Sequence, residues 1–450
     1  MFGDIPKVPT HPLWLPNVNA AFYAGQSGFD GALNSTRKSR DKSFTQAWVN
    51  ASVYGFSTSN TGAQNLAAWA ALAIAANASG GYLAVQWDAG VYLIDAASIT
   101  AYHAVGCTFT NVKNMILDGS KATFLVSNDA GPRAWIVQFV GAKNITLNLN
   151  WQGTNHTDDT NGIGGVWFTG GNSAIDYSYT GYKMFDCVRV GEGEDPAFTA
   201  STVYEGNHDF NLRGFCVDVY YGAAVYLTSN VNIWLEISRS TFGADTSYRA
   251  VYLEACNNVR AVSRSKNMAV PDGVNCICIG PRYTSPQMVG CTNIWLDATD
   301  LGTTQLVAYQ RLVKVYQVTT TNLKNTSANQ DNIHINVTLT MSATVWGSNP
   351  VVTFSSLGDQ GTCLNTYTNV FVSGRVTRLV ANNYRLLAVD SGSTGLSSLD
   401  LTVINFHDTL AGNRLMECLS ANTPVEVQTY LSDYGSFYAT TPAVQHLTAH

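Results

Sequence analysis

Short stretches of alternating polar and apolar residues recur along most of the chain. In SNVNIWLE, Ile233 and Leu235 alternate with Trp234 and Glu236, so a strand here would turn the first pair inward and the second pair outward. A polar residue followed by the same alternation recurs at these anchors: Asn114, Asn144, Asp209, Asn232, Asn258, Asn293, Asn332 and Asn369. The pattern predicts a repeated strand and not a repeated helix.

The spacing of the anchors indicates the architecture. Successive intervals are 30, 65, 23, 26, 35, 39 and 37 residues, and the interval of 65 leaves room for a further copy near residues 187–190. Intervals of 23 and 26 are too short for a propeller blade, which needs about 40–45 residues. We therefore predict an all-β solenoid, a parallel β-helix with three short strands per turn, in which Asn232, Asn258 and Asn293 stack vertically. An antiparallel sandwich is the alternative.

Residues 58–95 carry a different pattern. Leu66, Trp69, Leu72 and Ile74 predict an amphipathic helix, and Asn60 or Thr61 suits its N-cap. A glycine pair at residues 80–81 would end this helix, and YLAVQWDAGVYLI would supply the first strands. Such a helix would cover the open end of the coil and prevent edge-to-edge pairing of strands.

This order of polar turn, helix, glycine pair, apolar strand and GVYLI at residues 90–94 resembles the opening of many pectate-lyase-like β-helix proteins, bacteriophage tailspikes among them. That family usually has Asp residues in the opening turn, and STSNTGAQN has none, so the resemblance is to the superfamily as a whole. It implies a right-handed parallel β-helix solenoid with a short N-terminal capping helix. The expected segments are a leader at 1–55, the β-helix at 56–410, and a C-terminal cap or oligomer contact at 411–450.

Composition and charge exclude several classes of function. The net charge is −6 and no run of Lys or Arg occurs, so nucleic acid is not expected as a partner. The longest apolar run, residues 66–76, is too short to span a bilayer, so membrane insertion is not expected either. The histidines are scattered and no CxxC pair occurs, so we predict neither a metal site nor another cofactor.

Outward side chains on successive turns would lie about 4.8 Å apart, which suits a long repetitive ligand such as a polysaccharide. We align Tyr226 with Tyr252 on one strand, and Trp234 with Arg260 and Trp295 on the next. Exposed aromatic rings can stack on sugars, although they can equally face another subunit. The candidate substrate-binding residues are Trp167, Tyr226, Trp234, Arg249, Tyr252, Arg260 and Trp295.

Carboxylates supply the candidate chemistry. Glycoside hydrolysis uses two, about 5–5.5 Å apart for retention or about 6.5–9.5 Å apart for inversion. Our alignment places Glu205 and Glu254 two turns apart, about 9.6 Å at the backbone, and Asp218, Asp245 and Asp272 recur at equal spacing. The candidate catalytic residues are Glu205, Asp218, Glu236, Asp245, Glu254 and Asp272. On this prediction Glu254→Gln abolishes cleavage and preserves binding.

Taken with the resemblance, these features predict a tailspike-like depolymerase. It would be a homotrimer in a virion tail, acting outside the cell on a bacterial capsule, exopolysaccharide or O-antigen. A polysaccharide lyase is the alternative chemistry, with Tyr248 or Arg249 as the base. The pattern is also compatible with a secreted carbohydrate-active enzyme outside any virus and with a non-catalytic adhesin or fibre.

Overall fold

The computed structural model divides the chain into two units, Met1–Gln46 and Ala47–His450, and all described residues lie in the second. The predicted segment limits at residues 55 and 410 stay predictions. The described residues are 48–79, 82–99, 101, 103–127, 134–153, 162–191, 206–239, 249–268, 274–280, 282–284, 287–300, 310–316, 327–341, 351–355, 364–378, 385–389, 398–408, 414–418, 425–430 and 444–449.

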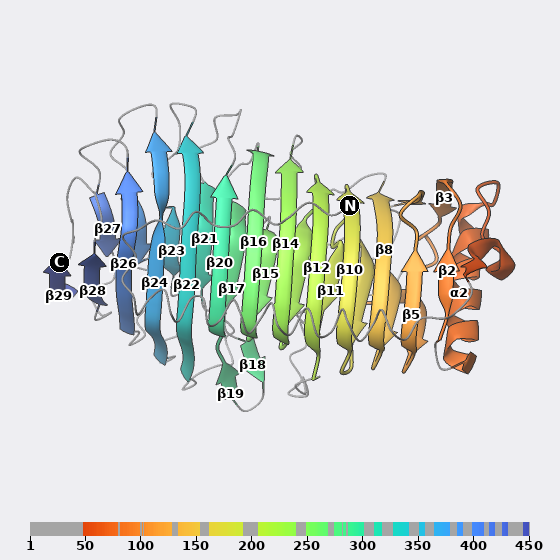
Figure 1. The fold of residues 1–450 in the computed structure, drawn as a ribbon, viewed down its shortest axis with the longest axis horizontal. Helices are drawn as coiled ribbons and strands as arrows, with labels where there is room; N and C mark the ends of the chain where they lie inside the picture. Colours follow the sequence, from red (N-terminus) through yellow and green to blue (C-terminus); the bar gives the residue numbers. More distant parts are fainter. Residues whose placement is uncertain are drawn as a thin grey trace. The chain divides into compact units, whose positions relative to one another are not determined.

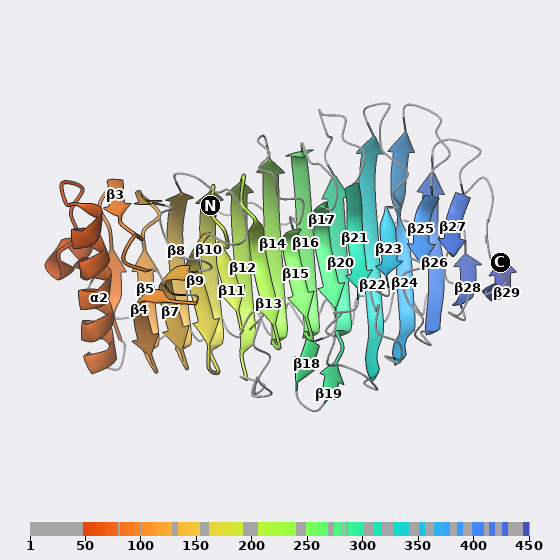
Figure 2. The same cartoon turned by 180° about the vertical axis from the view of Figure 1, so that it is seen from behind.

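Two parallel sheets carry the fold, and the chain passes from one to the other along most of its length, as Figures 1 and 2 show from opposite sides. Consecutive strands of a sheet come from successive turns of the chain, such as β10 beside β12 and β12 beside β14. This arrangement confirms the predicted parallel β-helix. Among the described helices, none combines the length and apolar character that a membrane crossing requires.

The first sheet, sheet A, contains β1 (Val49–Asn50), β2 (Ala84–Gln86), β3 (Gly90–Ile94), β5 (Lys113–Asp118), β6 (Ala122–Val126), β8 (Lys143–Gly153), β10 (Ser173–Tyr182), β12 (His208–Val217), β14 (Ser229–Arg239), β16 (Asn257–Met268), β20 (Thr292–Asp300), β22 (Ser327–Met341), β24 (Leu364–Arg378), β26 (Ser398–Asp408), β28 (Val425–Tyr430) and β29 (Val444–Ala449).

The second sheet, sheet B, contains β4 (Val105–Thr110), β7 (Ala134–Val140), β9 (Ile163–Thr169), β11 (Val188–Val190), β13 (Tyr221–Tyr226), β15 (Arg249–Glu254), β17 (Val274–Gly280), β21 (Gln310–Tyr316), β23 (Val352–Ser355), β25 (Arg385–Val389) and β27 (Arg414–Cys418). A short antiparallel pair, β18 (Arg282–Thr284) and β19 (Gln287–Val289), stands apart from both sheets.

Most described turns differ from the expected three short strands. Near the start of the coil β5 and β6 are separate, as expected, but β8 pairs with β5 through its first half and with β6 through its second half. From β8 onward, one long strand replaces the two short ones. Most described turns therefore consist of one long strand in sheet A and one shorter strand in sheet B.

The interior of the coil is apolar, as the alternation predicts. Ile233 and Leu235 on β14 are fully buried in it, whereas Trp234 and Glu236, which alternate with them, are only half-buried. The same inward positions on the neighbouring strands hold Leu212 and Ala261, also fully buried. Burial of these aligned side chains between the sheets is the main source of stability for a fold of this kind.

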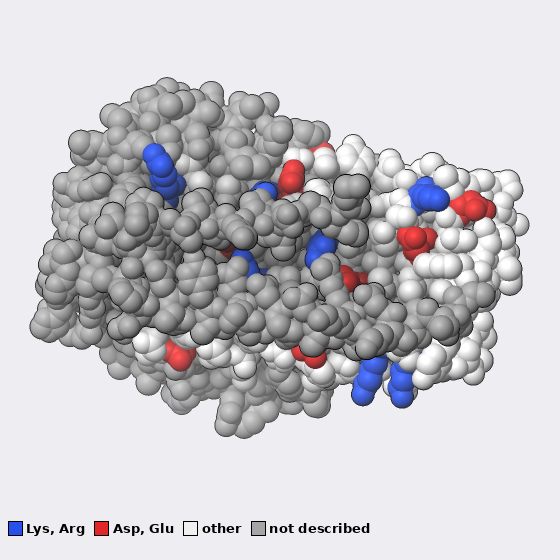
Figure 3. Space-filling model, in the orientation of Figure 1, with Lys and Arg blue, Asp and Glu red and all other residues white. Residues whose placement is uncertain are grey.

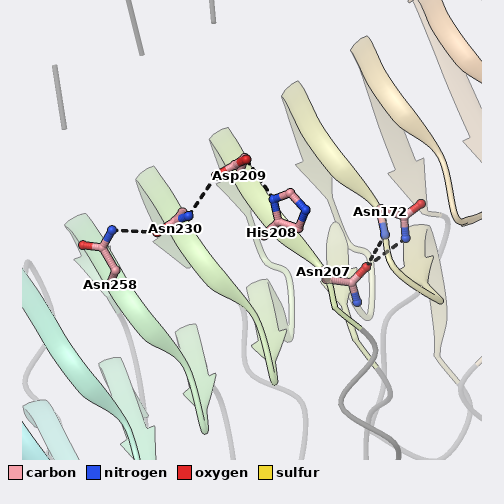
Figure 4. Close-up of polar contacts among 6 residues, drawn as sticks. All are labelled: Asn172, Asn207, His208, Asp209, Asn230 and Asn258. Carbon is pink, nitrogen blue, oxygen red and sulfur yellow. Dashed lines mark hydrogen bonds and ion pairs between the residues drawn. The ribbon is translucent and has the colours of Figure 1, made fainter. Parts of the chain in front are cut away.

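A ladder of side-chain amides marks the corner where the strands of sheet A begin. Asn258 donates to Asn230 at 2.7 Å, and Asn230 donates to Asp209 at 3.0 Å (Figure 4). These residues have positive φ angles, which Asn and Asp tolerate better than other side chains. A second amide pair, Asn172 and Asn207, is fully buried.

The ladder corrects two details of the sequence alignment. The stacked residue on β14 is Asn230, not Asn232, because Asn232 lies in register with Asn211 and Arg260. The missing copy in the interval of 65 is β10, where Ala174 has the left-handed φ of the ladder position. Residues 188–190 form β11 and belong to sheet B.

Helix α2 (Gly62–Ser79) covers the start of the coil, as predicted (Figure 1). Thr61 is its N-cap: the Gln64 amide donates to the Thr61 hydroxyl at 3.3 Å, and the Thr61 amide donates to the Gln64 side chain at 2.9 Å. Trp69 is fully buried among aromatic rings of the coil, at centroid distances of 5.3 Å from Trp87 and 6.1 Å from Trp151. Ile74, expected on the apolar face, is 70% exposed.

We expect Gly214→Ala to destabilise the coil by about 1–3 kcal/mol, because the interior has no room for the new methyl group. A Cβ atom at Gly214 would lie 2.5 Å from the Tyr179 ring and 2.7 Å from Leu235. The hydrogen bond from the Tyr179 hydroxyl to the Gly222 carbonyl, 2.9 Å long, holds that ring in place. Denaturant unfolding would measure the loss, and introducing Gly214→Ala into a Tyr179→Leu background should cost less. Equal costs in both backgrounds would contradict the packing argument.

Candidate functional site

The outward side of sheet A between β10 and β24 carries partly exposed side chains, and we call it the sheet A face. Its side chains align in three columns across neighbouring strands. The first column is Asp176, Asn211, Asn232, Arg260, Trp295, His334 and Phe371; the second is Ser178, Arg213, Trp234, Val262, Asp297, Asn336 and Ser373; the third is Thr180, Phe215, Glu236, Arg264, Thr299, Thr338 and Arg375. In Figure 3 the visible basic and acidic side chains are interspersed and do not gather by sign.

Trp234 lies near the middle of this face and is held by two neighbours. Phe215 meets it edge to face, with ring centroids 5.2 Å apart. The Arg264 guanidinium lies 5.9 Å from the Trp234 ring centroid, a cation–π contact that positions the charge. Phe215 is 52% exposed, so an apolar surface stays open beside Trp234.

Two carboxylates lie near this aromatic pair, on its side toward the end of the coil. Glu236 lies in register between Phe215 and Arg264, and Asp297 lies two strands beyond Trp234 in the second column. Two strand spacings and one two-residue step put their Cα atoms about 12 Å apart, so side chains that lean together reach the separation of about 6.5–9.5 Å typical of inverting glycosidases. Val262 lies between Trp234 and Asp297 in the second column.

The environment of Asp297 favours its protonated form. Burial raises the pKa of Asp297, and the hydrogen bond from the Thr299 hydroxyl, 3.4 Å long, only partly offsets it. The guanidiniums of Arg264 and Arg260 lower the pKa by smaller amounts. The net shift of the pKa is upward, which is the direction expected for a general acid.

A stack of three rings follows in the first column. His334 lies between Trp295, at a centroid distance of 5.6 Å and an interplanar angle of 10°, and Phe371, at 4.7 Å and 13°. Because the rings cover one another's faces, His334 has no free face for a sugar. The stack therefore acts mainly as packing along the coil axis, and Trp295 keeps only the face turned toward Arg260.

Burial lowers the pKa of His334 to about 4. Between that value and its ordinary pKa near 6.5, the unfolded chain binds a proton that the folded chain does not, so stability is full above pH 6.5 and falls as the pH drops toward 4. We expect His334→Phe, which preserves the stack, to remove about 1–2 kcal/mol of this loss. Denaturation midpoints at pH 7 and pH 4.5 would show it. A variant with the wild-type pH dependence would contradict the assignment to His334.

The outward side of sheet B is a second cluster, and it is buried. Trp135, Trp167, Tyr226 and Tyr252 are each at most 7% exposed. Glu254 is 1% exposed and accepts a hydrogen bond from the Tyr252 hydroxyl. These side chains point away from the coil interior, yet solvent does not reach them.

An ion pair occupies the centre of this sheet B cluster. Arg189 donates to Asp186 at 2.7 Å, and its guanidinium lies 4.9 Å from the Trp135 ring centroid and 5.4 Å from that of Tyr226. Burial alone would lower the pKa of Arg189, but Asp186 and Tyr226 outweigh it and raise the pKa, so the cation is retained. Removing either partner would leave a buried charge, which indicates a role in holding this face together.

The structure thus separates the predicted site residues into three groups. Trp234, Glu236, Arg260 and Trp295 lie on the sheet A face, whereas Trp167, Tyr226, Tyr252 and Glu254 lie in the sheet B cluster. Asp218 lies in the turn after β12, with a φ of 52° and 6% exposure. Glu205, Asp245, Asp272 and the side chain of Arg249 lie outside the described residues. The catalytic and binding roles assigned to all of these residues stay predictions.

Two of the predicted columns are wrong in register. Tyr226 pairs with Glu254, and Tyr252 pairs with Ala224, so Tyr226 and Tyr252 are not neighbours in one column. Trp234 pairs with Arg213 and Val262, one column away from Arg260 and Trp295. The expectation that Trp167, Tyr226 and Tyr252 are exposed is also wrong, because all three are buried. Both errors in register come from an offset of two residues between successive turns.

Several residues of the sheet A face were missed as site candidates. Phe215, His334 and Phe371 gave no sequence signal on their own, although Phe215 follows its ladder residue by six residues and the other two follow theirs by two. Asp297 was not among the candidate catalytic residues either. Anchoring the alignment on Asn230 would have placed Asp297 in the column of Trp234.

No family model matches the chain, and no curated protein matches it. One similar solved structure is the A-module of the Azotobacter vinelandii mannuronan C-5 epimerase AlgE4, with 13% identity and a TM-score of 0.40 over 90% of this chain and 100% of that one. Another is the A-module of the Azotobacter vinelandii epimerase AlgE6, with 12% identity and a TM-score of 0.38 over 89% of this chain and 99% of that one. A third is the Yersinia enterocolitica family 28 exopolygalacturonase (10%, 0.39, 90% and 77%). This chain is a parallel β-helix protein. The resemblance of this chain to bacteriophage tailspikes stays a prediction. A shared fold does not show a shared function, which depends on the side chains of the site.

Proposed function

We propose that this β-helix binds a bacterial surface polysaccharide along the sheet A face and hydrolyses its glycosidic bonds. One observation carries the proposal: the accessible aromatic pair Phe215 and Trp234 adjoins Glu236, and Asp297 lies two strands beyond Trp234 in the strand register of the coil. Aromatic rings bind the apolar faces of sugars, and two carboxylates at this separation can cleave the bond between them.

The roles follow from the surroundings of each carboxyl group. Asp297, whose pKa is raised by burial, donates a proton to the oxygen of the leaving sugar. Glu236, half-buried beside Arg264, removes a proton from the attacking water on the opposite side of the ring. The contact of Arg264 with Trp234 fixes the position of its guanidinium next to Glu236. Cleavage by this route inverts the configuration at the anomeric carbon.

Incubation with purified capsular polysaccharide, exopolysaccharide and lipopolysaccharide tests the proposal. New reducing ends without absorbance from an unsaturated uronate are the expected result. Reducing ends with that absorbance would mean β-elimination and would replace the hydrolase with a lyase. Binding with neither signal would mean a carbohydrate-binding adhesin or fibre.

We further propose a setting in a bacteriophage tail, with three copies of the chain acting at the bacterial surface. The support is the opening segment of residues 58–95, whose order of turn, helix and strands resembles that of tailspikes. Light scattering of the purified protein should give three times the mass of the 48.5 kDa chain. A monomeric mass would contradict the trimer and leave the sheet A face as a site within one chain.

A further inference from the structure

An exposed apolar patch lies beside the carboxylate pair, toward the start of the coil. It consists of Phe215, Tyr182 and Val217, which are 52%, 37% and 37% exposed, and we call it the Phe215 patch. Tyr182 and Val217 are direct register partners on β10 and β12, and Phe215 is two residues from Val217 on the same side of its strand. The three side chains therefore form one continuous surface, and Trp234 adjoins it through Phe215.

Polar groups surround this patch. Glu236 lies in register with Phe215, and Ser238 lies in register with Val217. On the opposite side, the Thr180 hydroxyl donates to Asn150 at 2.9 Å, and the Lys183 ammonium lies 5.2 Å from the Tyr182 ring centroid. Hydroxyl, amide, carboxylate and ammonium groups of this kind can bond the hydroxyls at the rim of a sugar ring.

The size of the patch decides between a sugar and a protein partner. A stable protein interface takes about 20–30 residues on each side with an apolar centre. The Phe215 patch offers three apolar side chains, and charged groups begin at its edge. Three apolar side chains with polar groups around them suit one apolar face of a sugar ring instead.

A row of outward side chains extends the patch along the coil axis. Outward positions in register with Val217 and Tyr182 continue through Gln152 and Leu125 to Leu93, which is 42% exposed. This line runs across the strands, along the coil axis, and away from Asp297. A linear ligand that contacts both the carboxylates and the patch must therefore lie along the axis.

We propose that the Phe215 patch binds a neutral sugar unit next to the cleaved bond, so that the polysaccharide lies along the coil axis from β20 toward β10. The sugar packs its C–H face on Phe215 and Tyr182, and its hydroxyls bond Glu236, Ser238 and Thr180. The identity of the ligand rests on the proposed function, but binding at the patch does not require cleavage.

The test compares dissociation constants of Phe215→Ala and Tyr182→Ala with that of the wild type. The probes are purified neutral and acidic bacterial capsular polysaccharides and O-antigens, measured by calorimetry or affinity electrophoresis. Each variant should weaken binding about fivefold for a polymer with neutral units, since one lost stacking contact is of the order of 1 kcal/mol. Phe215→Trp, which keeps a stacking surface, should restore binding. Ile74→Ala on α2, which removes an exposed apolar side chain elsewhere, should leave it unchanged.

The outcomes separate this inference from the proposed function. If the wild type binds without cleaving and Phe215→Ala weakens that binding, the subsite stands and the hydrolase fails. Wild-type affinity in both alanine variants would overturn the subsite even if cleavage is observed. Failure of the wild type to bind any probe, or a change of oligomeric state in Phe215→Ala with unchanged affinity, would overturn it as well.

Discussion

Trp69→Ala is expected to cost about 3–5 kcal/mol of the free energy of unfolding of the first turns of the coil, the largest loss of stability we predict for a single substitution. Trp69 is 0% exposed and closes the open end of the apolar interior. Its ring lies 5.4 Å from the Phe56 and Phe124 centroids, in addition to its contacts with Trp87 and Trp151. Alanine would leave a cavity among rigid rings that cannot close around it.

Urea unfolding followed by tryptophan fluorescence, together with limited proteolysis, would measure the effect. Proteolysis matters because loss of the cap exposes the edge of β3 and the first turns before the rest of the coil unfolds. Ile74→Ala is the matched control on the same helix, and its exposed position predicts a change within about 0.5 kcal/mol. Equal effects of the two substitutions would contradict the role of Trp69 as a plug.

The coil itself could be predicted because alternation with a period of two survives an error of two residues. Anchoring β14 on Asn232 in place of Asn230 still puts Ile233 and Leu235 inside. The hydrophobic interior therefore follows from the sequence even where the alignment of successive turns does not. The capping helix was equally accessible to prediction, since Thr61 and Gln64 are a recognisable N-terminal signal.

The site was harder to predict because it depends on register across turns. Two similar segments, AAVYL at residues 223–227 and RAVYL at residues 249–253, begin 26 residues apart in the sequence. Their strands nevertheless pair at an offset of 28 residues. Turns between strands vary in length, and no local rule fixes the offset. An error of two residues in the alignment moves a side chain by one column. Trp234 was therefore grouped with Arg260, although it shares its column with Asp297.

The exposure of outward side chains could not be predicted from the sequence either. Alternation shows that Tyr252 and Glu254 point out of the coil, but it does not show whether other parts of the chain cover them. On sheet A most of the outward side chains are partly exposed, whereas the residues of the sheet B cluster are buried. The predicted residues were therefore outward in both sheets but open to a ligand in only one.

The chemistry of the sheet A face is tested most directly by two isosteric substitutions, Glu236→Gln and Asp297→Asn. Each is expected to lower the rate of cleavage about 10²–10⁴-fold, because each removes one of the two proton transfers that hydrolysis requires. Binding should be preserved, since neither change alters Phe215 or Trp234. Asp118→Asn is the matched control: this carboxylate occupies the same column on β5, where Ser120 donates to it at 3.1 Å, and its loss should not affect the rate.

The two variants should differ in their response to the leaving group. A substrate whose leaving group needs no protonation should restore cleavage by Asp297→Asn, whose proton it makes unnecessary, but not by Glu236→Gln, which lacks the base for water.

Glu254→Gln decides between the two faces of the coil, because Glu254 lies in the buried sheet B cluster and was the leading candidate from sequence. Full activity of both sheet A variants combined with a folded, inactive Glu254→Gln would move the active site to sheet B.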